Sequence, residues 1–499
     1  IVIGAGMGGL NAAVMLKEAG IAFTVVEKNV AVGGTWLDNA YPGARLDTPS
    51  RTYTHVYGID FDWHSAFSPQ QDNLRYLEWI ADKYNLRSHI SFNTEVTSVI
   101  WDEAGAMWEL TVRTDKGTRK FRANVVISAC GLFSRAHIPS LQGLDRFQGQ
   151  WFHTSRWPKN LVTDDKRVAV IGTGATGYQM IPELARHAGH LTVFQRTPQW
   201  TVPVPGYTSA FPPAVKWLDR HFPFHRHFMH LRSAWLNGPR ERARLSDIDP
   251  NWHDPHTRSP VNKVMRDACV AFIQRKLAER PEFVEKMIPK HPFLSARPII
   301  VDPEYGIYDA LLRDNVTLVT EGIERITEHG IVSMDGTEHK LDVIVFATGF
   351  KANEFLWPME VRGRGGQRVE DLWAKDGARA YLGTMLPGFP NFFMIYGPNT
   401  NPFGGVSVVN REELTVRYAL ECIGYLLQEG KRSIEPRPES YWAYNSEVDR
   451  WEKRKIYTDA RAHSYYTTQF GRSAVNCPIP GQLVWALLRT LNFDELRVE

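Results

Sequence analysis

Two glycine-rich boxes, each preceded by a short apolar run, constrain this chain of 499 residues more than any other feature. The first box reads Gly4-Ala5-Gly6-Met7-Gly8-Gly9, and the second reads Gly172-Thr173-Gly174-Ala175-Thr176-Gly177. An apolar strand, a GxGxxG turn and a helix together form the unit that binds a dinucleotide. The sequence therefore predicts an α/β fold with two Rossmann-like dinucleotide-binding domains, one for each box.

The first box has the features of an FAD or NAD site. We expect Gly4 to make the tight turn, Gly6 to let the backbone approach a pyrophosphate, and Gly9 to let the helix pack against the strand. The next strand, expected at residues 23–26, ends in Glu27. A carboxylate at this place binds the ribose 2′-hydroxyl of a dinucleotide and repels a 2′-phosphate, so this box is not expected to hold NADP.

The second box has the opposite chemistry at the corresponding place. The strand expected at residues 191–194 ends in Gln195-Arg196-Thr197, without an acidic residue. A guanidinium can hold the 2′-phosphate of NADP through two hydrogen bonds. We therefore expect Arg196, with Thr197 beside it, to select NADPH over NADH.

The composition excludes several classes of protein. Hydrophobic residues make up 43% of the chain, charged residues 23%, and the formal net charge of +3 is too small to indicate nucleic acid or a membrane surface as a partner. The cysteines Cys130, Cys269, Cys422 and Cys477 form no CxxC pair, so neither a redox disulfide nor a zinc site is predicted. No apolar run is long enough to span a membrane, and a cytoplasmic location is expected. Ile1 already lies inside the first expected strand, so we expect an N-terminal segment to precede it.

The stretch between the boxes completes the pattern. It contains Phe147, one residue, Gly149, three residues, His153, three residues and Trp157. This spacing matches the fingerprint of the flavin-dependent Baeyer–Villiger monooxygenases of type I, and the chain resembles that family over nearly its whole length. The segment Gly471-Arg472-Ser473-Ala474-Val475-Asn476 is most similar to the 4-hydroxyacetophenone monooxygenase branch of the family.

The resemblance implies an activity, two cofactors and a set of flavin contacts. In the family, NADPH reduces FAD, and dioxygen then forms a C4a-peroxyflavin that inserts one oxygen atom next to a ketone carbonyl to give an ester or lactone. The implied partners are a small-molecule ketone and dioxygen. The residues implied to contact the flavin, in addition to the first box and Glu27, are Gly34, Thr35, Trp36, Arg45, Asp47, Tyr53 and Val96.

The resemblance also implies the catalytic residues. Arg297 matches the family's catalytic arginine, and Asp47 matches the carboxylate that holds it in place. Attack on a ketone creates an oxyanion, and a fixed guanidinium that never loses its proton stabilises such negative charge. Many family members carry Lys directly before this Arg as a second ligand for the 2′-phosphate. This chain has Ala296 there, so its NADPH preference is expected to rest mainly on Arg196.

The same interpretation divides the chain into six segments. The FAD-binding domain is expected to be discontinuous and to enclose the NADP-binding domain with its helical insert. The expected bounds are 1–140 for the first part of the FAD-binding domain, 141–158 for the linker with the fingerprint, 159–205 for the first part of the NADP-binding domain, 206–293 for the helical insert, 294–340 for the second part of the NADP-binding domain, and 341–499 for the second part of the FAD-binding domain.

Two groups of histidines have alternative roles. His153 could act as a general acid or base, or it could pin the linker between the domains, which is the role that the resemblance favours. His221, His225, His227 and His230 have helical spacings that could suit a metal ion. No carboxylate accompanies them in register, so an aromatic and basic contact surface is expected instead, and no metal site is predicted.

Three other functions remain open from the sequence. A flavin-dependent N- or S-oxygenase acting on amines or sulfides would share both boxes. A disulfide reductase would need a cysteine pair after the first box, which this chain lacks. A non-catalytic protein that senses NADPH would bind the cofactor without turnover.

Overall fold

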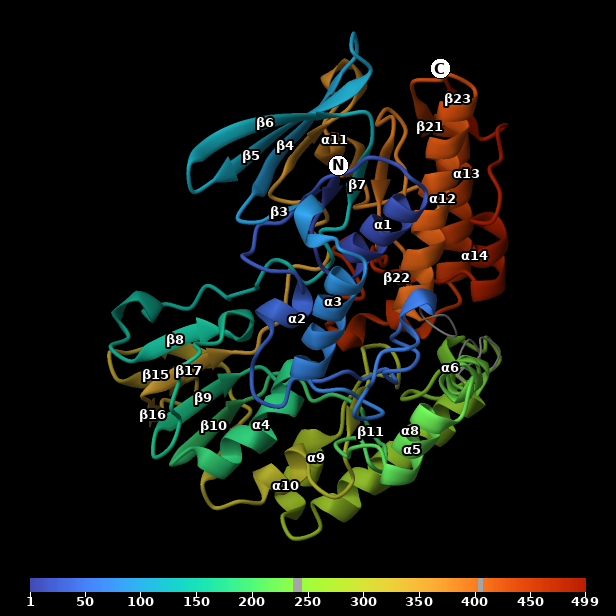
Figure 1. The fold of residues 1–499 in the computed structure, drawn as a ribbon. Helices are drawn as coiled ribbons and strands as arrows, with labels where there is room; N and C mark the ends of the chain where they lie inside the picture. Colours follow the sequence, from blue (N-terminus) through green and yellow to red (C-terminus); the bar gives the residue numbers. More distant parts are fainter. Residues whose placement is uncertain (237–244, 403–406) are drawn as a thin grey trace.

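Two parallel five-stranded sheets form the centres of two bodies, drawn one above the other in Figure 1. The structure is a computed structural model that describes residues 1–236, 245–402 and 407–499. The first sheet has the order β19-β7-β1-β2-β3, and its strands are β1 (Val2–Ile3), β2 (Val25–Val26), β3 (Ile90–Ser91), β7 (Val126–Ser128) and β19 (Phe392–Met394). The second sheet has the order β13-β10-β9-β17-β8, and its strands are β8 (Gln150–His153), β9 (Arg167–Ile171), β10 (His190–Phe194), β13 (Val316–Val319) and β17 (Val343–Phe346). The predicted α/β fold with two dinucleotide-binding units is confirmed.

Each glycine box is the turn between a central strand and the helix that follows it. Helix α1 (Met7–Glu18) begins inside the first box, and α4 (Ala175–His187) begins inside the second. A Cβ atom at Gly9 would lie 1.8 Å from the carbonyl oxygen of Gly4, and one at Gly177 would lie 2.3 Å from that of Gly172. Each helix can lie this close to its strand only because these positions are glycine.

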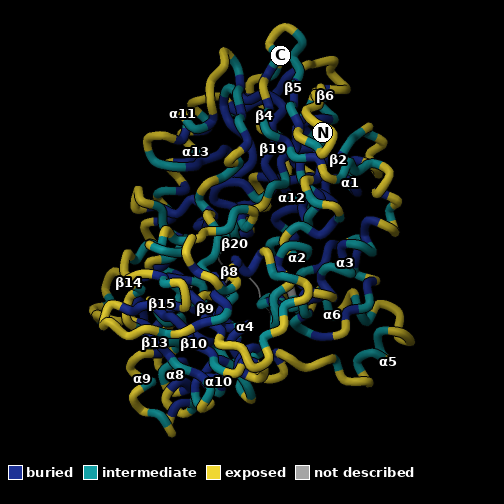
Figure 2. The backbone as a smooth tube through the Cα atoms, turned by 90° about the vertical axis from the view of Figure 1, so that its left-hand side faces the viewer, coloured by how far each residue is buried: buried dark blue, intermediate teal, exposed yellow. Residues whose placement is uncertain are grey.

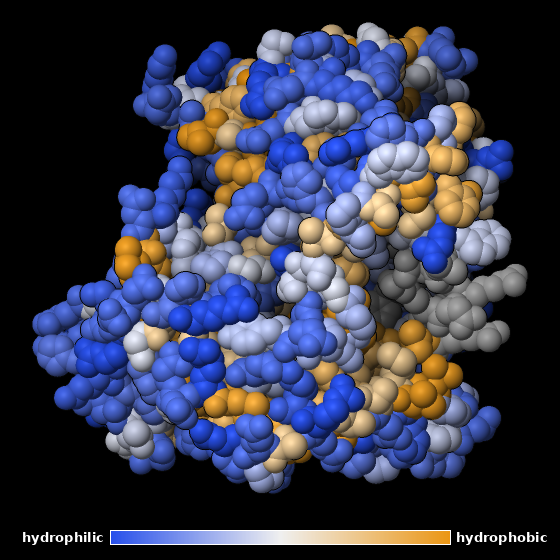
Figure 3. Space-filling model, turned by 60° about the horizontal axis from the view of Figure 1, so that its bottom comes forward, coloured by the Kyte–Doolittle hydropathy of each residue, from blue (hydrophilic) through white to orange (hydrophobic). Residues whose placement is uncertain are grey.

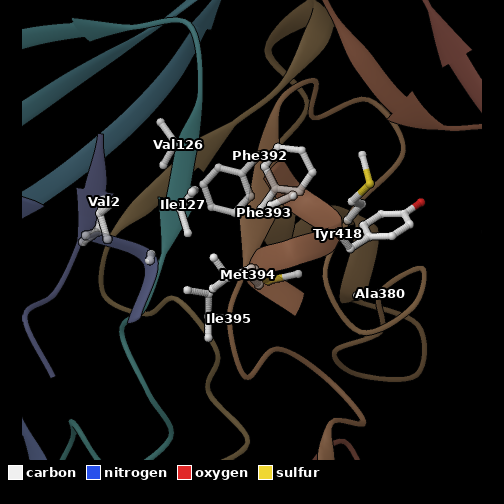
Figure 4. Packing of buried hydrophobic residues seen from close by; sticks show 14 of the residues in the cluster. Val2, Val126, Ile127, Ala380, Phe392, Phe393, Met394, Ile395 and Tyr418 are labelled. Carbon is white, nitrogen blue, oxygen red and sulfur yellow. The ribbon is translucent and has the colours of Figure 1, made fainter. Parts of the chain in front are cut away.

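A mixed four-stranded sheet, two strand pairs and several helices complete the first body. Its second sheet has the order β18-β4-β5-β6, with β4 (Glu95–Asp102), β5 (Met107–Thr114), β6 (Gly117–Ala123) and β18 (Glu360–Arg362). Its strand pairs are β20 (Asn401–Pro402) with β22 (Asn476–Cys477) and β21 (Ile434–Pro436) with β23 (Leu496–Val498). Its helices are α2 (Thr35–Asp38), α3 (Gln70–Lys83), α11 (Val369–Trp373), α12 (Val408–Gln428), α13 (Pro438–Glu452) and α14 (Gly481–Leu487). Figure 4 shows Val2, Ile127, Phe393 and Tyr418, from β1, β7, β19 and α12, in the core that joins the sheet to this helix.

The second body combines its parallel sheet with a layer of helices. Residues 206–293, expected to form a helical insert, contain α5 (Pro213–His221), α6 (His225–Leu236), α8 (Pro260–Lys276) and α9 (Pro281–Met287), and α10 (Ile307–Leu311) follows. The remaining strands are β11 (Thr201–Pro203), β12 (Ile299–Val301), β14 (Ile323–Ile326), β15 (Gly330–Ser333) and β16 (Glu338–Lys340). Short 3₁₀ helices cover Val56–Gly58, Arg87–His89, Leu144–Arg146, Thr154–Arg156, Arg364–Gly366, Ile456–Thr458 and Ala460–Ala462.

Two of the expected domain boundaries fall within the second sheet. Strand β17 was assigned to the FAD-binding domain at 341–499, but it lies in the middle of the second sheet, where Phe346 pairs with Ile171 and with His153. The expected linker at 141–158 contains β8, the edge strand of the same sheet. A short run of apolar β-branched residues suits any buried parallel strand, so only the pairing decides which sheet it joins.

Burial follows the two sheets. Figure 2 shows buried backbone at the centres of both bodies and exposed backbone mainly in the outer loops. Figure 3 shows a largely hydrophilic face with hydrophobic side chains scattered across it. Helices α5 and α6 expose several of the large apolar side chains, namely Trp217, Phe228 and Leu231. No helix in the described part of the chain has the length and apolar character needed to cross a bilayer.

The histidines of the insert make contacts to neighbouring segments. His225 Nδ1 lies 2.8 Å from Asp219 Oδ1, and the same carboxylate accepts a hydrogen bond from Arg51. The ring of His230 contacts the carbonyl oxygen of Arg51. Asp219 thus contacts His225 although it lies six residues away in the sequence, outside the helical spacings considered for a metal site. Among the described residues, no group of three potential metal ligands is present.

Candidate active site

A single large cavity of about 1420 Å³ connects the two glycine boxes. This volume exceeds the roughly 300–1,000 Å³ that is typical of a site for one small molecule. Most residues that the sequence analysis selected line this cavity: Gly4, Gly6, Gly8, Glu27, Gly34, Thr35, Trp36, Arg45, Asp47, Tyr53, Val96, Gly172, Thr173, Gly174, Ala175, Thr176, Arg196, Thr197 and Arg297. The fold thus brings together residues from both ends of the chain and from both bodies.

Two of the selected glycines lie outside the lining of the cavity. Gly9 and Gly177 were grouped with the cofactor-binding residues, but each lies behind its box, against the carbonyl oxygen of Gly4 or Gly172. Their role is to let α1 and α4 pack against the strands. They therefore shape the cavity indirectly.

Arg297 and Asp47 form an ion pair at the cavity. The Nε atom of Arg297 donates a 2.8 Å hydrogen bond to Asp47 Oδ2, and Nη2 donates to the same oxygen. Asp47 is the main reason why the pKa of Arg297 is raised well above its usual value, so the guanidinium stays charged at any accessible pH. The Arg297 side chain keeps 36% of its surface exposed, and the remaining N–H groups are available to a ligand in the cavity.

The first box and its neighbours form a cradle on the flavin side. Gly34 lies so close to Gly6 that a Cβ at Gly34 would be 2.9 Å from the Gly6 Cα. Trp36 Nε1 donates a 3.1 Å hydrogen bond to the hydroxyl of Tyr53. Glu27 is buried, and its carboxylate accepts hydrogen bonds from the backbone N–H of Ala5, at 2.6 Å, and of Asn29, at 2.8 Å. The carboxylate is thus held directly beside the box, at the end of β2.

The second box leaves open space above its backbone. No atom lies within 4 Å of the place where a Cβ on Gly174 would be. Arg196 follows β10, is exposed, and forms no hydrogen bond or ion pair within the described part of the chain. Ala296 also lines the cavity, so the position directly before Arg297 supplies no second positive charge.

The fingerprint histidine lies behind the cavity wall. His153 is 2% exposed and is not among the cavity-lining residues. Burial lowers the pKa of His153, so the ring is neutral: Nδ1 accepts a hydrogen bond from the backbone N–H of Ser155, and Nε2 donates to the carbonyl oxygen of Gly349 at 2.9 Å. The turn at 347–350 does line the cavity. His153 is therefore placed to hold this turn and cannot reach a substrate.

The other fingerprint residues are explained by packing. Trp157 meets Phe152 edge to face, with ring centroids 5.1 Å apart. A Cβ at Gly149 would lie 2.5 Å from the carbonyl oxygen of Asp342 and equally close to the buried ring of Phe147. Glycine at this position lets β8 pair with β17.

Gly149→Ala should therefore destabilise the protein. Overpacking of this kind costs typically about 1–3 kcal/mol, and the expected result is a lower midpoint of thermal unfolding. Gly424→Ala is the matched control. Gly424 lies inside α12 with no atom within 4 Å of a Cβ position, so alanine should be neutral or stabilising there. Equal unfolding midpoints for Gly149→Ala and wild type would contradict the packing argument.

Gln179 of α4 connects the two bodies next to the cavity. It accepts a hydrogen bond from the hydroxyl of Tyr41 at 2.9 Å and donates one to the carbonyl oxygen of Arg45 at 3.0 Å. Arg45 itself donates a 2.7 Å hydrogen bond to the carbonyl oxygen of Tyr207. Arg45 thus contributes to the contact between the bodies as well as to the cavity lining. Gln179 was not predicted, because a polar residue on a helix carries no sequence signal for such a contact.

Several further residues line the cavity. Tyr396, Tyr465 and Tyr466 line the cavity. Tyr465 and Tyr466 lie near enough to Arg297 to contribute to its raised pKa. Glu412, one turn into α12, lines it as well. Aromatic residues occur in every core and Glu in most helices, so their residue types alone do not identify these positions as part of a site.

The cysteines do not form a redox pair. All four are free, and Cys130 is the only one among the described cavity-lining residues. Burial raises the pKa of the Cys130 thiol, which disfavours its reactive thiolate form. A disulfide reductase mechanism therefore has no chemical basis in this cavity.

Comparisons with known proteins agree with this geometry. Residues 1–216 match the family model described as pyridine nucleotide-disulphide oxidoreductase. A Baeyer-Villiger monooxygenase of Streptomyces coelicolor is 34% identical over 479 residues, covering 96% of this chain and 88% of that protein, and an uncharacterized monooxygenase of Sinorhizobium fredii is 34% identical over 499 residues, covering 100% and 75%. The crystal structure of OTEMO in complex with FAD and NADP matches with a TM-score of 0.84 and 30% identity, covering 100% of this chain and 98% of that one. The chain belongs to the family of Baeyer–Villiger monooxygenases.

Proposed function

We propose that this chain holds FAD over the first glycine box and NADPH over the second, and inserts one oxygen atom of dioxygen next to the carbonyl group of a ketone. The product is an ester or a lactone. The observation that carries the proposal is the Arg297–Asp47 ion pair at the wall of a cavity that both boxes share. A positive charge at this place serves an oxygen-transfer reaction in which negative charge develops on the reactants.

The donor groups of the cavity fit the two cofactors. At the first box, Gly4 and Gly6 leave the backbone accessible, and Glu27 is held at the end of β2, where it can accept a hydrogen bond from a ribose hydroxyl. At the second box, the open space over Gly174 suits a pyrophosphate, and the unpaired guanidinium of Arg196 suits a 2′-phosphate. The assignment of FAD to the first box and NADPH to the second follows from the opposite charges of Glu27 and Arg196.

Arg297 stabilises the negative charge of the reaction, and Asp47 keeps its guanidinium in place. When bound, FAD accepts a hydride from NADPH and in its reduced form supplies the electrons that activate dioxygen. The ketone oxygen becomes an oxyanion when its carbonyl carbon is attacked. Two of the guanidinium N–H groups face Asp47, which leaves the others to donate hydrogen bonds to oxygen atoms in the cavity.

His153 acts as a positioning residue in this proposal. It holds the turn at 347–350 through the Gly349 carbonyl oxygen. The same carbonyl oxygen also accepts a 2.8 Å hydrogen bond from the backbone N–H of His137, which lies in the segment that leads from the first body to the second. A shift of the fingerprint strand would therefore be transmitted to a wall of the cavity.

The aromatic wall near Arg297 suggests the class of ketone. Tyr396 and Tyr465 pack with Phe133 and Phe355 around a small apolar cluster, and these four residues line the cavity. Flat apolar rings of this kind suit an aryl or bulky apolar substituent next to the carbonyl group. The finer placement near the 4-hydroxyacetophenone monooxygenase branch is in line with this.

The segment 471–476, which is similar to the 4-hydroxyacetophenone monooxygenase branch, packs behind the cavity wall. The Nη2 atom of Arg472 donates a 2.8 Å hydrogen bond to Asn399 Oδ1, and the Asn399 amide donates to the carbonyl oxygens of Ser473 and Asn476. These contacts join 471–476 to the loop that precedes α12.

We further propose the domain division with its boundaries corrected. The FAD-binding domain comprises residues 1–140 and the chain after β17, and the NADP-binding domain extends from β8 to β17. A cytoplasmic location also remains part of the proposal, because the four cysteines are unpaired, as is usual in a reducing compartment.

Incubation of the purified protein with NADPH, isotopically labelled dioxygen and a substrate panel tests the proposal. The panel should include aryl ketones, cyclic aliphatic ketones, sulfides and amines, with mass spectrometry as the readout. We expect an ester or lactone with one labelled oxygen atom, and faster conversion of the aryl ketones. Formation of sulfoxides or N-oxides alone, or no product from a protein whose FAD is reduced by NADPH, would overturn it.

A further inference from the structure

Glu412 brings a carboxyl group close to the first glycine box. A Cβ placed on Gly8 would lie 3.5 Å from the Glu412 Cδ and 3.6 Å from its Oε1. Glu412 belongs to the first turns of α12, whose beginning also lines the cavity through Ser407 and Val408. The carboxyl group therefore lies where the backbone of the box meets the helix start.

Within the described part of the chain, this carboxyl group forms no hydrogen bond or ion pair. Glu412 is 7% exposed, and its Oε2 atom has no hydrogen-bond partner among the described residues. An unpaired buried carboxylate is costly, whereas a ligand in the cavity could satisfy the group. The first box is the part of the cavity where the phosphates of a dinucleotide approach the backbone.

We propose that Glu412 binds FAD as a neutral carboxylic acid, donating a hydrogen bond to the phosphate or ribityl oxygens that lie over the first glycine box. The inference rests on the proposed function in that it takes FAD as the ligand of this box. An ionised carboxylate at the same place would repel the FAD phosphates. The proton is thus what turns a repulsive contact into a binding one.

The surroundings of Glu412 favour this protonated form. Burial, and then the negative charge of Glu413, raise the pKa of Glu412 to about 8. Burial also raises the pKa values of Tyr53, Tyr57 and Tyr396, which face Glu412 from other segments, well above their usual range. These hydroxyls stay neutral between pH 6 and pH 10, since the phenol of an exposed Tyr already titrates only near about 10.

The remaining charged groups near the site do not neutralise Glu412. Arg411, its neighbour on α12, donates from Nη2 to the carbonyl oxygen of Leu382 at 2.7 Å. The positive charge of Arg297 is paired with Asp47. Among the described residues, Glu412 forms no ion pair with either arginine.

The pH dependence of FAD release from the holoenzyme tests the inference. FAD dissociation is followed by the rise of free-flavin fluorescence after dilution, from pH 6 to pH 10. A raised pKa means that the neutral form dominates below it and that ionisation at higher pH weakens binding. The dissociation rate of wild type should therefore increase with pH. The expected increase is about tenfold for each unit by which the pKa of Glu412 is higher in the FAD-bound protein than in the FAD-free protein.

Two variants assign this increase to one residue. Glu412→Gln keeps a neutral donor, so its dissociation rate should stay low and change less than twofold over the same range. Glu413→Gln is the matched control on the same helix, because the Glu413 carboxylate instead accepts a hydrogen bond from the Val56 N–H at 2.8 Å. It should still show the increase with pH, with its midpoint moved to lower pH because the charge of Glu413 no longer raises the pKa of Glu412.

The outcomes distinguish this inference from the proposed function. A flat profile for wild type overturns the inference without any variant, and so does a Glu412→Gln profile that rises as steeply as wild type. In either case the protein would still bind FAD and could still oxidise ketones. A protein that binds no FAD at any pH would instead contradict the proposed function.

Discussion

Arg297→Ala should lower the rate of ketone oxidation by roughly a hundredfold or more, which is the usual effect of removing one fixed group that stabilises an oxyanion. The reduction of bound FAD by NADPH should change little, because hydride transfer creates no oxyanion for Arg297 to stabilise. The two steps are measured separately, by product formation in the presence of dioxygen and by the loss of flavin absorbance in its absence.

Two further variants separate charge from geometry at this position. Arg297→Lys keeps the positive charge but loses the planar fork that places two N–H groups on Asp47, so most of the rate loss should remain. Asp47→Asn keeps the arginine and removes only the charge that orients it, so a smaller loss is expected. If Arg297→Ala formed ester at the wild-type rate, the role proposed for this residue would have to be abandoned.

Arg196→Ala should raise the KM for NADPH about tenfold to a hundredfold and leave the KM for NADH nearly unchanged. A hydrogen bond to a charged group contributes about 1.5–3 kcal/mol, and each 1.4 kcal/mol corresponds to about a factor of ten in affinity. The large effect is expected because Ala296 offers no second cation at the neighbouring position, so the 2′-phosphate depends on this one guanidinium. Steady-state kinetics with both cofactors measure the ratio directly.

Arg313→Ala is the control for this measurement. Arg313 is an exposed arginine of the same body that does not line the cavity, and its Nε donates to Asn315 Oδ1 at 3.2 Å. Its removal should leave both KM values unchanged. Equal effects of Arg196→Ala on NADPH and NADH would show that Arg196 does not recognise the 2′-phosphate.

The local parts of the fold could be predicted from the sequence. A box such as 4–9 determines its own turn, because Gly4, at φ +101°, adopts a backbone conformation that other residues rarely take and Gly9 has no room for a side chain. The charged residues that follow β2 and β10, Glu27 and Arg196, also lie within a short stretch of chain after their boxes. For these reasons the two dinucleotide-binding units and the opposite charges that follow them could be predicted from the sequence alone.

The long-range parts of the site could not be derived in this way. Arg297 and Asp47 are 250 residues apart, and their pairing was expected only from the resemblance to the family. Strand β17 was placed in the wrong domain, because its residues suit either sheet. The packing role of Gly9 was expected from its place in the box, but the cofactor contacts were assigned to whole boxes, so Gly9 and Gly177 were included although each faces a backbone carbonyl.

The sequence by itself thus determined the two dinucleotide-binding units and the charge that follows each of them, since these depend on contacts between residues close together in the chain. Only the tertiary structure decided that both units open into one cavity, that His153 lies behind its wall, and that the carboxyl group of Glu412 lies near Gly8 with no hydrogen-bond partner for Oε2 among the described residues. The physical reason is that burial and the supply of hydrogen-bond partners are properties of the packed molecule. A glutamate on a helix has the same sequence signal whether it ends in water or beside a glycine box.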